Sequence, residues 1–294
     1  MSGFGFSIQG LLIKILEESG MSSFELIIIR GFIQASVSYA IIRHNKNNGE
    51  TASLFGDGLY PRSILALRAI FGWGGIGFGF LAIEHLPIAD ASVLLMQSPV
   101  LAAILGYVIL GEPWRLPEFC STLVSMTGVV LIAKPHFIFD HLGSLGQTGA
   151  VAPRSDSLGP VFGLLAAFSA GSAFVMVRLL GTSAKMPWAN VGFATALAQV
   201  ILSVPVLFVS GQKATLDLGV FEWSLLLIGG VTGTVSQLAM TIGMQREKSA
   251  SASAMRTSDV FFAFIWQVLF TSDPVTALSV SGAVLVMVGV MIIV

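Results

Sequence analysis

A short polar stretch inside an apolar run near the C-terminal end holds the residues best suited to chemistry. Arg256, Thr257, Ser258 and Asp259 follow one another there. Placing an ionisable side chain within a membrane span costs roughly 2.5–3.5 kcal/mol, so such groups usually face water or one another. Arg256 and Asp259 stand three residues apart, which puts both on one face of a helix and allows them to pair. The pattern predicts either a structural ion pair or a binding site at mid-membrane, in which Asp259 is the candidate for proton coupling.

A second polar pair, Gln97 and Ser98, lies inside another apolar run. In both runs a stretch of small residues comes just before the polar group, 89–92 in one and 249–254 in the other. Small residues allow helix backbones to approach closely, and polar groups beside such a contact line the space where two bundles meet. We therefore expect a central polar cavity. Residues at comparable depth are candidates to stack on or hydrogen-bond a solute, although each also suits simple helix packing: Trp73, Tyr107 and Gln237.

The composition makes lipid the solvent of this chain. Of its 294 residues, 54% are hydrophobic and only 11% are Asp, Glu, Lys or Arg, and the mean hydropathy is +0.86. A soluble domain carries about 25% charged residues, so neither a soluble nor a disordered protein fits. The net charge of -1 offers no basic surplus for the phosphates of a nucleic acid. The single cysteine excludes an intrachain disulfide and a cysteine-based metal cluster, and we expect no cofactor.

Apolar runs long enough to approach or cross the hydrocarbon core of about 30 Å recur along the whole chain. The first contains Gln9 and Lys14 and suits a short or interfacial helix as well as a full span. Arg30 and Arg68 lie near span ends, where a long side chain reaches the interface. We expect an all-α membrane protein with ten transmembrane helices, near 4–18, 24–43, 63–83, 88–110, 116–133, 159–181, 187–209, 221–244, 249–271 and 275–294.

The longest polar interruption separates five of these runs from the other five. It predicts a first five-helix repeat at 1–135, a loop at 136–158 and a second five-helix repeat at 159–294. Because each half holds an odd number of spans, the halves must enter the membrane from opposite sides, which is the arrangement of an inverted repeat. A shift of 160 residues places Gln97-Ser98 on Thr257-Ser258.

The basic residues predict how the chain is oriented. If the N-terminus is cytoplasmic, eight Lys or Arg residues fall in the inside loops and four fall at the outside ends of spans. Cytoplasmic loops carry such an excess of basic residues. We therefore expect both termini to face the cytoplasm.

Two apparent motifs do not support an enzyme. Residues 72–77 fit the dinucleotide pattern G-x-G-x-x-G, but they lie inside a lipid-length apolar run instead of following a strand. We interpret this stretch as a helix-packing face that includes Gly75 and Gly79. His85 and Asp90 have the H-x-x-x-x-D spacing found in acyltransferases, yet they flank a tight turn between two spans and no second acyl-binding motif follows.

In its first half the chain resembles the drug/metabolite transporter superfamily, specifically its EamA-type domains. Four strings carry the resemblance: 86–91, 97–100, 110–113 and 128–132 with Pro135. The flanking strings Phe24-Glu25, Arg30-Gly31 and 68–72 are most similar to the G-type branch of solute carrier family 35. The second half keeps the pattern of small residues and the spacing of Gly282 and Gly289.

The resemblance implies two inverted repeats and a cavity that opens to either side in turn. Spans three, four, eight and nine are implied to line this cavity. The implied lining includes Gln97, Ser98 and Pro99, and in the second repeat Thr257, Ser258 and Asp259. The second half departs from the pattern because Asp259 and Ser272 stand where the first half has Pro99 and Glu112.

We therefore expect a multi-pass carrier that moves a small polar organic solute across a lipid bilayer by alternating access. Arg256 would anchor an anion or dipole, and Asp259 would be its counter-charge or the coupling group. A non-transporting membrane partner protein is the main alternative, and a membrane acyltransferase is a second one. The sequence leaves open the solute, the coupling ion, the membrane and the oligomeric state, a homodimer included.

Overall fold

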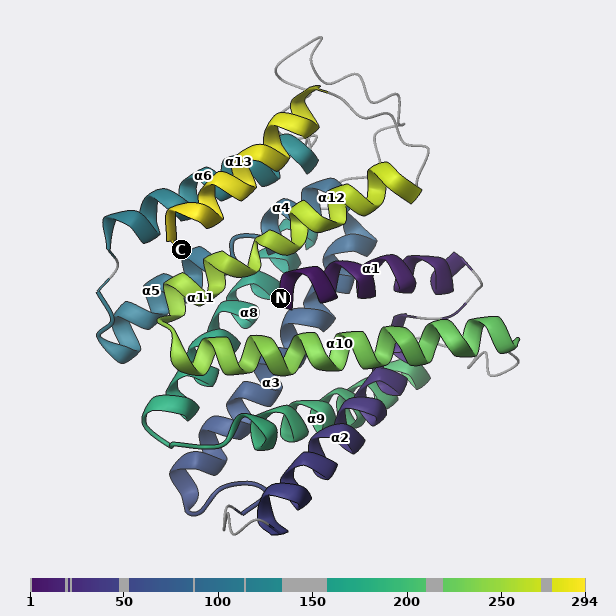
Figure 1. Cartoon of the computed structure of the whole chain (residues 1–294), viewed down its shortest axis with the longest axis vertical. Coiled ribbons are helices and arrows are strands. Elements are labelled where there is room, and N and C mark those ends of the chain that lie inside the picture. Colours follow the sequence, from purple (N-terminus) through teal and green to yellow (C-terminus); the bar gives the residue numbers. More distant parts are fainter. Residues whose placement is uncertain are drawn as a thin grey trace. The chain divides into compact units, whose positions relative to one another are not determined.

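The computed structural model describes residues 2–18, 21, 23–47, 53–86, 88–113, 115–133, 158–209, 219–270 and 277–293. These residues form helices and short connections, without a strand among them. The helices are α1 (Ser2–Glu18), α2 (Ser23–Asn47), α3 (Leu59–His85), α4 (Ile88–Leu95), α5 (Ser98–Leu110), α6 (Leu116–Ala133), α8 (Leu158–Thr182), α9 (Trp188–Val209), α10 (Val220–Arg246), α11 (Ser249–Arg256), α12 (Ser258–Phe270) and α13 (Ala277–Ile293) (Figure 1).

Each predicted apolar run consists mainly of helix where the structure describes it, which confirms an all-helical membrane fold. Six stretches in the described ranges are long and apolar enough to cross a bilayer, and α6 and α13 supply shorter apolar helices. The first helix, α1, has 17 residues and is not among those stretches. The predicted loop at 136–158 lies outside the described residues except for Leu158, where α8 begins.

Two of the predicted spans contain a short turn between two helical segments. The run at 88–110 is divided into α4 and α5 by a turn at Met96 and Gln97. The run at 249–271 is divided into α11 and α12 by a turn at Thr257. The parts match in length, 8 and 13 residues in both runs, and the 160-residue shift carries Ser98–Leu110 onto Ser258–Phe270. The interruption is therefore a repeated feature of the chain.

The sequence explains both interruptions locally. Pro99 has no backbone N–H and cannot continue a preceding helix, but it suits the first turn of α5. Just before it, the Gln97 N–H bonds to the Leu94 carbonyl oxygen at 3.1 Å, a tightened turn. In the second run Thr257, Ser258 and Asp259 are residues whose side chains compete for backbone groups. Asp259 lies in the first turn of α12, where the helix dipole favours a carboxylate.

The chain divides into two compact units that differ from the expected halves. Unit 1 contains residues 1–73 and 176–247, and unit 2 contains residues 74–175 and 248–294. Helices α3 and α8 contribute residues to both. Each unit thus contains segments from the first and the second half of the sequence.

In unit 1, α2 packs against α9 and α1 packs against α10 (Figure 1). Near one end of the α2–α9 pair, the position of a Cβ on Gly31 lies 2.8 Å from the Val200 side chain. Toward the other end, the Cβ position of Gly192 lies 3.2 Å from Ser38 Oγ. Because the lower-numbered residue of α2 meets the higher-numbered residue of α9, these two helices run antiparallel. The Gln34 amide donates to the Gly192 carbonyl oxygen at 3.0 Å.

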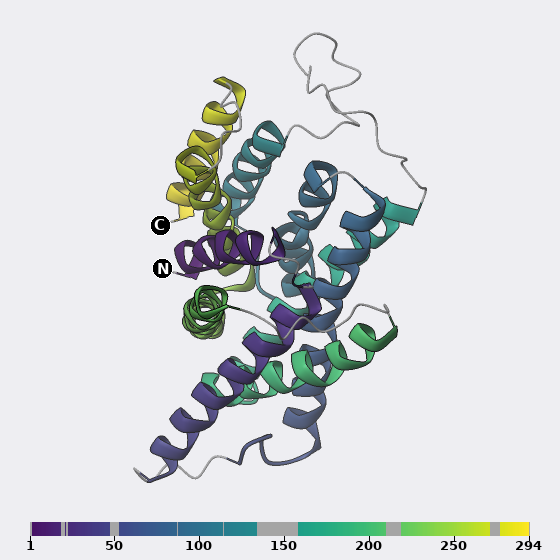
Figure 2. The same ribbon diagram turned by 90° about the vertical axis from the view of Figure 1, so that its right-hand side faces the viewer.

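In unit 2, α6 and α13 lie side by side in both views (Figures 1 and 2). A Cβ added to Gly128 would lie 2.5 Å from the Gly282 carbonyl oxygen, and one added to Gly282 would lie 2.6 Å from the Gly128 oxygen. Farther along, Ser121 Oγ donates to the Gly289 carbonyl oxygen at 2.6 Å. These pairs also show an antiparallel crossing, in which glycine lets two backbones touch.

The glycine-rich stretch at 72–77 lies inside α3, as the packing interpretation predicted. A Cβ on Gly75 would contact Ala170 of α8 at 3.4 Å, and a Cβ on Gly79 would contact the Leu95 side chain at 3.4 Å. His85 stacks on the ring of Phe162 with centroids 5.6 Å apart. These residues serve helix packing.

Substituting Gly128 with Ala should lower the melting temperature of the detergent-purified protein. The new methyl group would overlap the Gly282 oxygen, and the separation of α6 from α13 should cost about 1–3 kcal/mol. Gly243→Ala is the matched control, because no atom lies within 4 Å of its Cβ position and Ala is a better helix former by about 0.5–1 kcal/mol. Equal melting of the two variants would contradict this account of the crossing.

Candidate functional site

One turn of α8 meets both interrupted helices inside unit 2. A Cβ on Gly171 would lie 3.1 Å from the Ser98 carbonyl oxygen, so α8 touches the start of α5. Three residues later the ring of Phe174 lies under the guanidinium carbon of Arg256, 5.3 Å from the ring centroid. Residues three apart share a helix face. The beginning of α5 and the end of α11 therefore approach the same face of α8.

A shared apolar cluster brings the two interruptions together as well. Val93, Val129 and Val286 form a buried cluster on α4, α6 and α13. Met96, at the first interruption, packs against this cluster, and so does Val260, just after the second. Residues at both interruptions thus pack against the same apolar cluster.

Arg256 and Asp259 form the charged pair that the sequence predicted. Arg256 Nε lies 3.9 Å from Asp259 Oδ2, with the two side chains 33% and 16% exposed. This separation is longer than the 2.7–2.9 Å of a tight charge-assisted hydrogen bond. The other carboxylate oxygen, Asp259 Oδ1, is buried and has no hydrogen-bond partner among the described residues. The Asp259 carboxylate therefore has capacity to accept a further donor.

Five other predicted site residues lie at the two interruptions. Ser98 and Thr257 are buried, 7% and 5% exposed, and Pro99 is buried beside Ser98. Gln97 donates from its amide to the Val93 carbonyl oxygen at 3.4 Å, and Ser258 begins α12 half-buried. Together with the ion pair, these residues make the interruptions of unit 2 polar within an apolar surrounding.

Three predicted residues are placed elsewhere. Tyr107 is 63% exposed on α5. Trp73 belongs to unit 1, where its indole N–H donates to Ser203 Oγ at 3.1 Å. Gln237, also in unit 1, is 7% exposed and accepts a hydrogen bond from Arg30 Nη2 at 3.3 Å. Trp73 and Gln237 therefore have partners within their own unit.

Sequence reasoning missed the network around Arg30. With its amide oxygen turned toward Arg30, Gln9 accepts from Nη1 at 3.2 Å and from Nε at 3.3 Å. Arg30 thus joins Gln9 of α1 to Gln237 of α10, and a small hollow beside it is lined by Gln9 and Leu226 among others. Each of these polar residues stood out singly in the sequence, but their pairing depends on how three helices pack.

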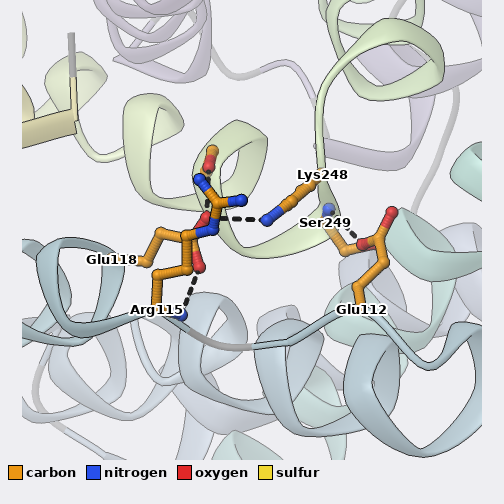
Figure 3. Close-up of polar contacts among 6 residues, drawn as sticks. Glu112, Arg115, Glu118, Lys248 and Ser249 are labelled. Atoms are coloured by element: carbon orange, nitrogen blue, oxygen red, sulfur yellow. Dashed lines mark hydrogen bonds and ion pairs between the residues drawn. The ribbon is translucent and has the colours of Figure 1, made fainter.

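A second polar group, the carboxylate clasp, joins the start of α11 to α5 and α6 (Figure 3). Glu118 accepts from the Arg115 N–H at 2.8 Å and from Ser251 Oγ at 3.1 Å, and Lys248 Nζ lies 3.8 Å from it. Glu112 accepts from the Ser249 N–H at 2.9 Å. We define the clasp as these residues: Glu112, Arg115, Glu118, Lys248, Ser249 and Ser251.

The clasp positions the second interruption. The first N–H groups of a helix have no partner within the helix, and a carboxylate placed there is stabilised by the helix dipole. The Glu112 carboxylate, which comes from outside α11, accepts the Ser249 N–H at the start of α11. The Glu118 carboxylate, in the first turn of α6, accepts the N–H of Arg115 just before α6. The start of α11, seven residues before Arg256, is thereby fixed to two helices of the first half of the chain.

Sequence comparison identifies the fold and the family. The profile of the EamA-like transporter family matches residues 1–134 and again residues 157–294. The chain belongs to the EamA-like transporter family. It is therefore an integral multi-pass membrane protein of a transporter family, within the drug/metabolite transporter superfamily, and not a member of an enzyme family.

Several of the matching proteins are named as solute carriers, exporters or probable transport proteins. Solute carrier family 35 member G1 of Mus musculus is 30% identical over 98% of this chain and 75% of its own length. Pseudopaline exporter CntI of Pseudomonas aeruginosa is 26% identical over 98% of this chain and 92% of its own length. Probable transport protein YPL264C of Saccharomyces cerevisiae is 29% identical over 71% of this chain, and the chain spans 60% of that protein's length.

A solved crystal structure shares this fold. It superposes with a TM-score of 0.75 at 17% identity and covers 98% of this chain and 95% of its own. The shared fold therefore covers both halves of the sequence.

Removing the clasp carboxylates should destabilise the protein. Glu118→Ala leaves the Arg115 N–H and the Ser251 hydroxyl without their acceptor, and we expect a loss of about 1–2 kcal/mol, seen as a lower melting temperature in detergent. Glu118→Gln keeps an acceptor oxygen and should lose less. Glu247→Ala removes an exposed carboxylate next to Lys248 and serves as the control. Melting of Glu118→Ala at the temperature of that control would show that the clasp contributes nothing.

Proposed function

We propose that this EamA-family protein moves a small polar organic solute across its membrane by alternating access through a central cavity. The observation that carries the proposal is the matched interruption of α4/α5 and α11/α12. Discontinuous helices at the bilayer midplane expose backbone groups and helix ends, and transporters with inverted repeats typically build their solute and ion sites from them. An interrupted span in each half, at positions related by one constant shift, fits this design.

Two inverted five-helix repeats, at 1–135 and 159–294, form the framework of the proposed mechanism. The second helices of the two repeats are α2 and α9, and the fifth helices are α6 and α13. Both pairs run antiparallel, as the two contacts described above for each pair indicate. Equivalent helices that run in opposite directions support an inverted repeat, in which each repeat can rock against the other.

The residues at the interruptions take distinct roles. Arg256 holds an anionic or dipolar group of the solute, and its pairing with Phe174 keeps the guanidinium at the interruption. Asp259 is its counter-charge and the coupling group, because its Oδ1 oxygen has acceptor capacity to spare. Hydrogen bonds to the solute come from Gln97, Ser98, Thr257 and Ser258, and Pro99 is the remaining proposed lining residue of unit 2.

The proposal includes the orientation predicted from the basic residues, in which both termini face the cytoplasm. Among the relatives, CntI is named an exporter, which supports an outward movement of a metabolite. A non-transporting partner protein would place the same polar residues against a helix of another protein, and purified protein in liposomes would then accumulate no solute.

A solute screen tests the proposal directly. Purified protein is melted in the presence of polar metabolites that differ in charge, since a bound solute raises the melting temperature. Each stabilising solute is then tested for uptake into liposomes that contain the protein. We expect at least one stabilising solute to be carried, and stabilisation without any transport would support the partner-protein alternative.

Arg256→Gln and Asp259→Asn should each abolish or strongly weaken transport of that solute while leaving membrane insertion intact. Asp259→Asn keeps the size of the side chain and Arg256→Gln shortens it; both remove the charge, so they test the ion pair at the second interruption. Arg246→Gln removes an exposed arginine at the end of α10 and should transport normally. Normal transport by both site variants would remove Arg256 and Asp259 from the proposed site.

A further inference from the structure

A groove runs between α3 and α9 within unit 1. Its volume is about 700 Å³, and apolar side chains of both helices line it. Small residues form part of the lining, among them Ala66 and Ala69 on α3 and Ala194 and Ala198 on α9. The larger lining residues Ile70 and Ile201 are 57% and 63% exposed. The groove is therefore open along its side.

One end of the groove is closed by a hydrogen bond between its two helices, and the segment at the other end is held in place by a side-chain amide. At one end the indole N–H of Trp73 reaches across from α3 to Ser203 of α9. At the other end lie Ser53, Leu54 and Phe55. The Asn190 amide holds this segment by donating to the carbonyl oxygens of Ser53 at 2.8 Å and Leu54 at 3.3 Å.

The length of the groove corresponds to one leaflet of a bilayer. Along α9 it extends from Ala194 to the contact at Ser203, which at a rise of 1.5 Å per residue is about 13 Å. Half of the hydrocarbon core of a bilayer is about 15 Å. An acyl chain that enters at one membrane surface would thus reach the closed end near the middle of the bilayer.

The mouth of the groove is basic. Arg62 lines it, and its Nε donates to the Gly56 carbonyl oxygen at 3.2 Å, which leaves the terminal guanidinium nitrogens as further donors. Lys185 is exposed beside Met186, whose side chain touches Gly56. Asp57 is the acidic residue of this segment and is also exposed. The expected orientation puts the mouth at the cytoplasmic surface, where anionic lipids gather and attract basic residues.

We propose that this groove binds one anionic phospholipid, with an acyl chain between α3 and α9 and the headgroup phosphate at Arg62 and Lys185. An apolar slot of leaflet depth with a basic mouth matches both parts of such a molecule. The bound lipid fills the space between two helices that are otherwise joined at Trp73 and Ser203, so it supports the packing of unit 1. This site is separate from the interruptions of unit 2 and does not depend on the proposed transport activity.

Native mass spectrometry of the full chain in mild detergent tests the proposal. The protein is offered phosphatidylglycerol and phosphatidylcholine with identical acyl chains. We expect one tightly retained phosphatidylglycerol and about a 25-fold preference over phosphatidylcholine, because each of the two basic residues favours binding of an anionic lipid by about fivefold. Equal retention of the two lipids would overturn the charge assignment.

Two pairs of variants separate the headgroup contact from the acyl contact. Arg62→Gln with Lys185→Gln should abolish the preference for phosphatidylglycerol, whereas Arg246→Gln, an exposed arginine outside the groove, should keep it. Ala198→Phe fills the groove and should lose both lipids, whereas Val235→Phe, on an exposed face of α10, should retain them. Lipid retention by Ala198→Phe would overturn the proposed site.

A photo-crosslinking experiment on the unmodified protein gives a result that does not depend on whether the variants fold. Phosphatidylglycerol with a photoreactive group in its acyl chain is bound and irradiated, and the attached residues are identified by peptide mass spectrometry. We expect attachment at groove residues such as Ile70, Leu197 and Ile201. Attachment spread over all lipid-facing helices, without enrichment at these residues, would show nonspecific lipid contact only.

Discussion

A polar group placed within lipid is costly unless it has a partner, and this constraint organises both units of the protein. Arg30 is satisfied by two amides on neighbouring helices. Arg256 lies between an aromatic face and a carboxylate. Gln97, Ser98 and Asp259 place further polar groups inside apolar runs, and polar groups at that depth are tolerated only where protein or a water-filled cavity surrounds them. The cavity-lining role proposed for the interruptions follows from this requirement.

The sequence predicted the helices well because the bilayer fixes their length and composition. Each expected run corresponds to described helix, and the charge pair Arg256–Asp259 was predicted from spacing alone. The interruptions were not predicted, although Pro99 after Ser98 carried a signal for the first one. The second interruption has no proline, and Thr257, Ser258 and Asp259 only weaken a helix.

Contacts between distant segments were beyond sequence reasoning. Trp73 and Gln237 were chosen by depth in their spans, but depth does not tell which face of a helix a residue occupies. The structure pairs them with Ser203 and Arg30. Likewise Glu112 was visible as part of a family string, yet its partner, the Ser249 N–H, lies in the other half of the chain. Such pairings depend on the three-dimensional packing of helices, which a single sequence does not encode as a periodic pattern.

Three charged residues of the carboxylate clasp have uncharged residues at the corresponding positions of the other repeat. At positions shifted by 160 residues, Glu112 corresponds to Ser272, Glu118 to Leu278 and Lys248 to Ile88. A contact between ions weakens as ionic strength rises, whereas apolar contacts hold or strengthen in salts such as sulfate. The attachment of α11 to α6 through Lys248 and Glu118 should therefore loosen as the salt concentration rises, whereas the apolar packing of α6 against α13 should not.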